Sequence, residues 1–173
     1  MDTEQRIIEL FDSACIKQFE SLGCEVEGVG LLAHSGDIHR AYIEATSEEL
    51  SVMLCLNVSR KLLLQTMPTV GSADESLIKD WILELANRFL GRLKNKLISH
   101  SCVLKMGLPQ FCADDQAQKS LQNKFVQTAR YFEINNEVVE CCLFIDISDD
   151  AEALSEYEDE DEDWFEESEL EHL

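Results

Sequence analysis

Three residues of one short stretch, Glu84, Asn87 and Gly91, have types and spacings that suit binding to a partner. Residues three and four apart on an α-helix lie on the same face, so the carboxylate and the carboxamide would project side by side. A carboxylate accepts hydrogen bonds, a carboxamide donates and accepts them, and a glycine one turn further on lets another backbone approach closely. The spacing predicts a polar docking strip; the alternative, from periodicity alone, is an ordinary solvated helix face.

Two of these residues, Asn87 and Gly91, weaken the helix that carries them. Glycine in a helix interior is about 0.8–1.0 kcal/mol less favourable than alanine, and asparagine is also a poor helix former. At 100° per residue the apolar side chains fall on one side: Ile78, Trp81, Ile82, Leu85, Ala86, Phe89, Leu93 and Leu97. Asp80, Glu84, Asn87 and Gly91 fall opposite. We expect these four to face away from the core, with Asp80 either assisting docking or remaining a solvated acid.

Helical periodicity and capping residues predict three helices. The longest is expected over residues 72–98, opened by Ser72 and Glu75 at the spacing of a capping box. An amphipathic helix is expected over 3–22. A short helix is expected to begin after a Ser59 cap and to end before Pro68.

Alternation and turn residues predict the strands. Two hairpins are expected, 25–33 with 38–45 and 126–134 with 137–147, the second turning at Asn135-Asn136. A buried strand is expected over 50–58, a further strand over 102–109, and a loop or short helix over 112–124. The order α-βββ-αα-β-ββ lacks a regular βαβ alternation. It predicts an α/β layered sandwich in which two long helices pack on a largely antiparallel sheet.

The charge of the chain divides it into two parts. The net charge is −21 over 173 residues, and residues 149–173 contain 14 Asp and Glu but no Lys or Arg. We therefore expect one domain over 1–148, of net charge about −7, and an acidic, disordered tail over 149–173. Nucleic acid is excluded as a ligand class because phosphate binding needs a basic surface. Trp164-Phe165 in the tail suggests a short docking segment, the alternative being a purely solvating tail.

The cysteines and the apolar runs indicate the compartment. There are seven cysteines, an odd number, with no C-x-x-C pair, and most lie in apolar runs. We expect them to be reduced core residues, and we expect no metal on this chain. We see no signal peptide, and no apolar run reaches 18 residues. A cytoplasmic protein without a membrane span is expected.

The stretch from Glu84 to Gly91 resembles the E-x-x-N-x-x-x-G helix of the CheX/CheC-type chemotaxis phosphatases. The following residues 92–97 are similar to the continuation of that helix, and residues 107–111, GLPQF, look like the Leu-Pro segment at the end of the next strand. The likeness of pattern spans roughly residues 5–147 and is specific around 72–110. Because only one E-x-x-N copy is present, the chain resembles the CheX-like branch rather than the two-motif CheC pattern.

This resemblance implies a phosphatase that hydrolyses the aspartyl phosphate of a CheY-type response regulator. Asn87 would hold the attacking water in line with the phosphorus, and Glu84 would pair with a lysine of the regulator; direct general-base catalysis by Glu84 is the weaker alternative. Asp80 and Gly91 would belong to the docking surface. Mg²⁺ would be held by the regulator, and a homodimer is implied.

A second function remains open on the same fold: a non-catalytic module that binds a response regulator or associates with the motor switch. The bulky pair Arg88-Phe89 inside the motif keeps this binding function open as an alternative. Residues 85–113 contain no acid, and their basic residues either receive an acidic partner or are ordinary charges near the helix end: Arg88, Arg92, Lys94, Lys96 and Lys105.

Overall fold

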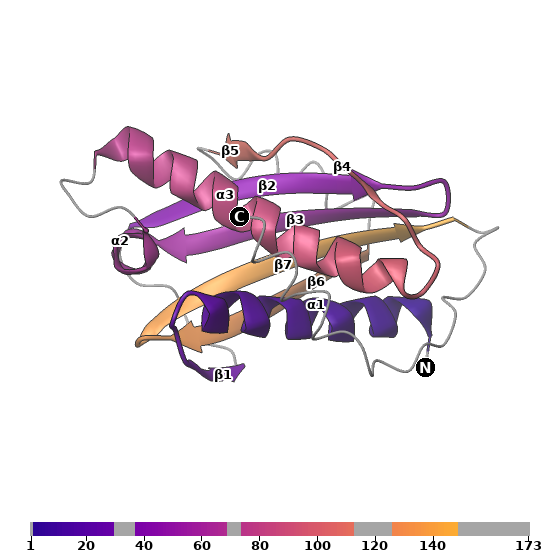
Figure 1. Ribbon diagram of the computed structural model, residues 1–173, viewed down its shortest axis with the longest axis horizontal. Coiled ribbons are helices and arrows are strands. Elements are labelled where there is room, and N and C mark those ends of the chain that lie inside the picture. The colour runs from indigo at the N-terminus through magenta and orange to yellow at the C-terminus, as the bar shows by residue number, and fades with distance from the viewer. Residues whose placement is uncertain (1, 30–36, 69–73, 113–125, 149–173) are drawn as a thin grey trace.

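The computed structural model describes residues 2–29, 37–68, 74–112 and 126–148. Two long helices lie across one face of a curled sheet (Figure 1). The elements follow in the order α1 Thr3–Ser21, β1 Val26–Val29, β2 Ile38–Thr46, β3 Leu50–Ser59, α2 Arg60–Thr66, α3 Glu75–Ile98, β4 Lys105–Met106, β5 Gln110–Cys112, β6 Val126–Ile134 and β7 Glu137–Ile147. The predicted α/β sandwich with two long helices is confirmed, with one additional short strand.

The sheet is antiparallel throughout, in the order β1-β6-β7-β3-β2-β4, with β5 also pairing with β2. The expected hairpin of 25–33 with 38–45 is wrong. Strand β1 pairs with β6, where Val26 lies opposite Ile134, and β2 pairs with β3 instead. Alternation of apolar and polar residues indicates which face of a strand is buried, but it does not specify the neighbouring strand.

The hairpin of β6 and β7 is confirmed, with its turn at the predicted residues. Asn135 has φ 52° and Asn136 has φ 64°. A two-residue turn with positive φ at both positions matches the twist of the flanking strands, and asparagine tolerates that conformation better than most residues. The Asn135-Asn136 pair therefore predicted the position of the turn correctly from sequence.

The strand expected over 102–109 is much shorter than predicted. Only Lys105–Met106 pair with β2 there, and Gln110–Cys112 form a second short strand against β2. Pro109, between the two, has no backbone N–H and cannot donate to the ladder. Gly107 instead donates to the carbonyl oxygen of Glu44 over 2.7 Å. The loop or short helix expected over 112–124 lies almost wholly outside the described residues, as does the tail.

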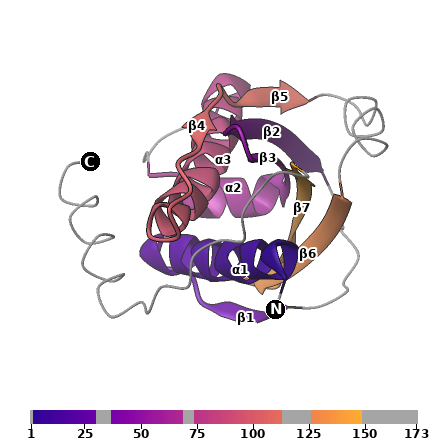
Figure 2. The same cartoon turned by 90° about the vertical axis from the view of Figure 1, so that its right-hand side faces the viewer.

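The main core lies between the sheet and the helices. Alternate residues of β2, β3 and β7 are buried against the apolar faces of α1 and α3. The rings of Phe19 in α1 and Phe89 in α3 lie 5.0 Å apart, and Figure 2 shows these two helices side by side within the curve of the sheet. Six cysteines are buried free thiols, as expected: Cys15, Cys24, Cys55, Cys102, Cys141 and Cys142. No helix in the described ranges is long and apolar enough to cross a membrane.

Candidate functional site

Helix α3 places the four predicted site residues on the face opposite its core side. Asp80 and Asn87 are exposed, and Glu84 and Gly91 are half-buried. Trp81, Leu85 and Phe89, by contrast, are at most 5 % exposed. We call Asp80, Glu84, Asn87 and Gly91 the α3 strip. The prediction that these residues face away from the core is confirmed, while their roles stay predictions.

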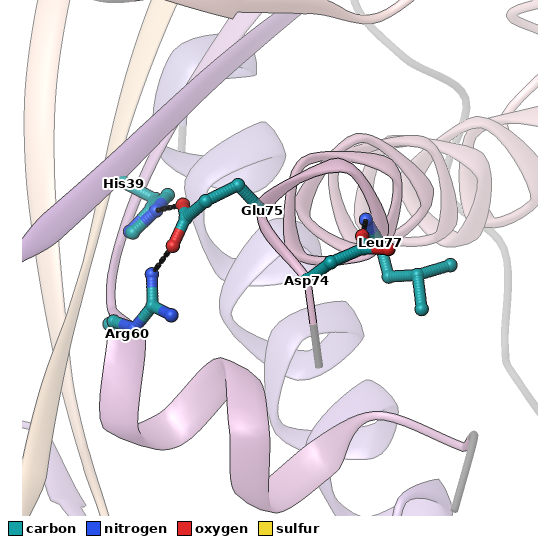
Figure 3. Close-up of polar contacts among 5 residues, drawn as sticks. All are labelled: His39, Arg60, Asp74, Glu75 and Leu77. Carbon is teal, nitrogen blue, oxygen red and sulfur yellow. Dashed lines mark hydrogen bonds and ion pairs between the residues drawn. The ribbon is translucent and has the colours of Figure 1, made fainter. Parts of the chain in front are cut away.

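The predicted capping box, with Ser72 as the N-cap of α3, is wrong. Asp74 is the N-cap, and its carboxylate accepts from the backbone N–H of Leu77 over 2.8 Å (Figure 3). Ser72 lies outside the described residues. An aspartate two positions later offers the same acceptor chemistry as the serine and adds a negative charge at the positive end of the helix dipole.

Instead of the expected capping contact, the side chain of Glu75 connects the start of α3 to two other elements. Its carboxylate accepts from the guanidinium of Arg60, the first residue of α2, and lies 3.8 Å from Nε2 of His39 in β2 (Figure 3). The hydrogen bond from Arg60 is the largest cause that lowers the pKa of Glu75. These contacts fix the beginning of α3 relative to α2 and β2, about one and a half turns before the strip begins at Asp80.

The rest of α3 is anchored near both ends of the strip. The indole Nε1 of Trp81 donates to Oγ1 of Thr66 in α2 over 2.9 Å, and Nε of Arg92 donates to Oε1 of Gln18 in α1 over 2.7 Å. The strip therefore lies on a helix whose rotation about its own axis is fixed by neighbours at both ends. Sites on well-packed helices hold their side chains more accurately than sites on loops.

Asn87 presents an unengaged carboxamide. It is exposed, and it forms no side-chain hydrogen bond with any residue in the described ranges. All of its donor and acceptor positions are available to water or to a partner. The side chain can therefore orient a water molecule without first breaking a bond within the chain.

Glu84 has a partner that the sequence analysis did not foresee. Nε of Arg88 donates to its Oε1 over 2.9 Å, one turn further along the helix, and Oε2 has no partner in the described part of the chain. The spacing of an acid four residues before an arginine was the available sequence signal. One carboxylate oxygen is thus occupied and the other is free.

Gly91 is open on the outer side of the helix. A Cβ built at this position meets no atom within 4 Å. Packing within the chain therefore gives no reason for a glycine here. The open space is compatible with the predicted docking role and equally with an ordinary solvated helix face.

The basic residues of 85–113 do not form one exposed basic face. Lys96 is 3 % exposed, and Arg88 and Arg92 are engaged by Glu84 and Gln18. This arrangement favours the interpretation of ordinary charges near the helix end. No group of three or more histidine, cysteine or acidic side chains arranged to hold a metal occurs among the residues described.

A hollow of about 430 Å³ lies elsewhere, lined by β2, β3 and residues 105–110, with no contribution from α3. Glu44 and Lys105 are the charged residues of its wall. The α3 strip, in contrast, lies along the outer side of a helix. Chemistry there would need a partner to complete the site.

Comparison with known proteins places the fold. No family model and no curated protein sequence matches the chain. Among solved structures, the chemotaxis protein CheX from Vibrio vulnificus superposes with a TM-score of 0.65 at 10 % identity, covering 81 % of this chain and 96 % of that one. The chain therefore has a CheX-like fold.

Two further structures are informative about partners of such folds. A CheX–CheY–BeF₃–Mg²⁺ complex from Borrelia burgdorferi matches with a TM-score of 0.60 at 14 % identity, over 80 % of this chain and 96 % of that one. A FliM–SpeE complex from H. pylori contains a chain that matches with a TM-score of 0.53 at 6 % identity, over 81 % and 84 %. At these identities the likeness concerns the fold alone.

Proposed function

We propose that this protein hydrolyses the aspartyl phosphate of a CheY-type response regulator. The observation that carries the proposal is the Glu84-x-x-Asn87 pair on the outer face of α3 in a CheX-like fold. The related fold from Borrelia burgdorferi is bound to CheY with BeF₃ and Mg²⁺. An aspartyl phosphate is a reactive acyl phosphate, so its hydrolysis needs positioning more than new covalent chemistry.

In the proposed reaction, Asn87 enters the phosphorylation site of the regulator and orients a water in line with the phosphorus. The water oxygen forms a bond to phosphorus while the bond to the aspartyl oxygen breaks, which yields aspartate and inorganic phosphate. The water proton passes to a phosphate oxygen or to bulk water. The unengaged carboxamide of Asn87 supports this role, because it can accept from the water and donate to a phosphoryl oxygen.

Glu84 is proposed to pair with a lysine of the regulator and so to seat Asn87. Its Oε2 is available for such a contact, since the bond from Arg88 occupies Oε1. Asp80 and Gly91 complete the proposed docking surface, one as an exposed acid and the other as clearance. No metal on this chain takes part in the proposal; Mg²⁺ would be held by the regulator.

The test follows the decay of phosphorylated CheY-type regulators of the source organism with wild type, Asn87→Ala and Glu84→Ala. Wild type should accelerate decay of at least one regulator. Asn87→Ala should lower the rate by about 10²-fold or more with affinity retained, the usual scale for loss of a group that acts in the transition state. Failure of wild type to accelerate decay of any regulator would contradict the proposal.

A non-catalytic binding module is the second candidate, favoured by the likeness to a chain of the FliM–SpeE complex. Such a module would bind a regulator or a switch component without changing the rate of dephosphorylation. Titration calorimetry with regulators loaded with BeF₃⁻ and Mg²⁺ separates the two functions: affinity without acceleration supports the module, whereas affinity with acceleration supports the phosphatase.

A homodimer is also proposed, from the resemblance to CheX and from the open sheet. The sheet has β1 at one end and the short β4 and β5 at the other, and an edge strand offers unpaired backbone groups. Light scattering on the full chain decides this: a mass of about twice the 19.7 kDa protomer supports the dimer.

A further inference from the structure

Arg88 stands between two groups that restrain it. Its Nε donates to Oε1 of Glu84 over 2.9 Å, and its guanidinium lies 5.3 Å from the centre of the Trp81 ring. The Arg88 side chain is 31 % exposed and that of Glu84 is 45 % exposed. A guanidinium that lies over an aromatic ring within cation–π distance while it donates to a carboxylate is restrained by both contacts.

The Trp81 ring is itself fixed, so it supports Arg88 from a defined position. Trp81 is 5 % exposed, and its Nε1 donates to Oγ1 of Thr66 over 2.9 Å. The Thr66 hydroxyl in turn donates to the carbonyl oxygen of Leu62 over 2.9 Å. A continuous series of contacts therefore runs from the backbone of α2 through Trp81 and Arg88 to Glu84.

The helix geometry places Arg88 on the side of Glu84 that is farther from Asn87. At 100° per residue, Glu84 lies roughly 60° around the axis from Asn87, Arg88 roughly 100° and Trp81 roughly 120°. Arg88 is thus closer to Glu84 and Trp81 than to the line along which Asn87 projects. Any influence of Arg88 on a partner at Asn87 would be transmitted through the Glu84 carboxylate.

We propose that Arg88 is a positioning residue that holds Glu84 in its docking conformation before the regulator arrives. This inference rests on the proposed function, because it concerns how Glu84 meets the regulator lysine. Arg88 engages Oε1 and leaves Oε2 free, so Glu84 already occupies one conformer and need not be ordered during binding. Pre-ordering a long side chain lowers the entropic cost of association.

A merely stabilising role would predict a different outcome. Half-exposed pairs four residues apart on a helix contribute little to folding stability. Arg88→Gln should therefore fold with nearly the thermal stability of wild type, and its effect should appear in recognition. It is expected to raise KM for the phosphorylated regulator about three- to tenfold, with kcat within about twofold of wild type.

A double-mutant cycle tests whether Arg88 acts through Glu84. KM is compared for wild type, Arg88→Gln, Glu84→Gln and the double variant. If the proposal holds, Arg88→Gln has no further effect once Glu84 is replaced. An equal KM increase in both backgrounds overturns it, and so does a fall in kcat at unchanged KM.

Two further variants complete the experiment. Lys79→Gln is the matched control, because it removes a positive charge from the same helix at a residue whose ammonium lies over the Phe111 ring rather than beside Glu84, and it should leave KM unchanged. Arg88→Lys keeps the charge without the planar guanidinium and its fixed donor geometry, and it should recover only part of the affinity. Full recovery by lysine would contradict the role assigned to the guanidinium geometry.

The same cycle is measured as affinity for CheY-type regulators loaded with BeF₃⁻ and Mg²⁺, which separates this inference from the proposed activity. If wild type binds but does not accelerate decay, the phosphatase proposal fails, and the affinity cycle still decides the role of Arg88. Unchanged affinity in Arg88→Gln overturns the positioning role while leaving the phosphatase proposal intact. If wild type binds no regulator, both proposals are contradicted.

Discussion

The rings of Phe19 and Phe89 lie 5.0 Å apart and join the two long helices behind the face that carries Asn87. Phe89 is fully buried, although it follows the exposed Asn87 by only two residues. Two positions on a helix are about 200° apart, so neighbouring residues serve opposite sides. The same short segment therefore contains one side chain that packs in the core and another that is exposed on the proposed docking surface.

Substitution of Phe89 and substitution of Asn87 should have opposite consequences for the free energy of unfolding. Phe89→Ala should lower the free energy of unfolding by about 3–5 kcal/mol, because it leaves a cavity between α1 and α3. Asn87→Ala should leave stability unchanged or raise it slightly, by up to about 0.7 kcal/mol, because alanine is the better helix former. Urea unfolding measures both, and a large loss of stability in Asn87→Ala would contradict the assignment of this residue to the partner.

Gly91→Ala should stabilise the protein and weaken docking. Alanine at this helix position should raise the free energy of unfolding by about 0.8–1.0 kcal/mol, since its Cβ meets nothing within 4 Å. Affinity for a BeF₃⁻-loaded regulator should fall, because the methyl group occupies the clearance proposed for the partner. An affinity equal to that of wild type would show that Gly91 does not lie in the docking surface.

Glu75 should make stability depend on pH at the acidic end. Its pKa is lowered in the folded protein, mainly by the hydrogen bond from Arg60, so the charged carboxylate is favoured by folding. The resulting stabilisation is present above the unfolded pKa of about 4.3 and is lost as pH falls through the lower folded pKa. The difference in stability between wild type and Glu75→Gln should therefore shrink below about pH 4.

Urea unfolding of wild type and Glu75→Gln between pH 7 and pH 3 measures this difference. Arg60→Gln is the control, since without its main partner the carboxylate should contribute less at every pH, and Glu75→Gln should then have a smaller effect. A stability difference that grows as the solution is acidified would contradict the ion pair as its source.

The face of α3 was predictable from sequence, whereas its attachments were not. A repeat of 3.6 residues decides which side of a helix is apolar, and this was sufficient to place Asp80, Asn87 and Trp81 on their correct sides. The choice of Asp74 over Ser72 as the cap was not predictable, because both side chains accept the same hydrogen bond. The contacts of the next residue differ from those of a capping box as well: Glu75 pairs with Arg60 and His39, which are distant in sequence.

The strands show the same division between local and distant information. Asn135-Asn136 specifies a tight turn by itself, so the pairing of β6 with β7 followed directly. The partner of β1 depends on how the sheet curls around α1, and no local pattern contains that information. The contact of Arg88 with Glu84 has a local signal, the spacing of four residues on a helix, but that spacing permits an ion pair without requiring one.

The division of α3 into a core side and an outer strip has a consequence for divergence. Asp80, Glu84, Asn87 and Gly91 lie outside the core side of α3. These positions can therefore be substituted while the buried residues of the helix stay the same. A set of such proteins could thus serve different partners on an unchanged scaffold. If the proposed docking surface is correct, transplanting these four positions, together with Arg88, should transfer partner choice between two proteins of this fold.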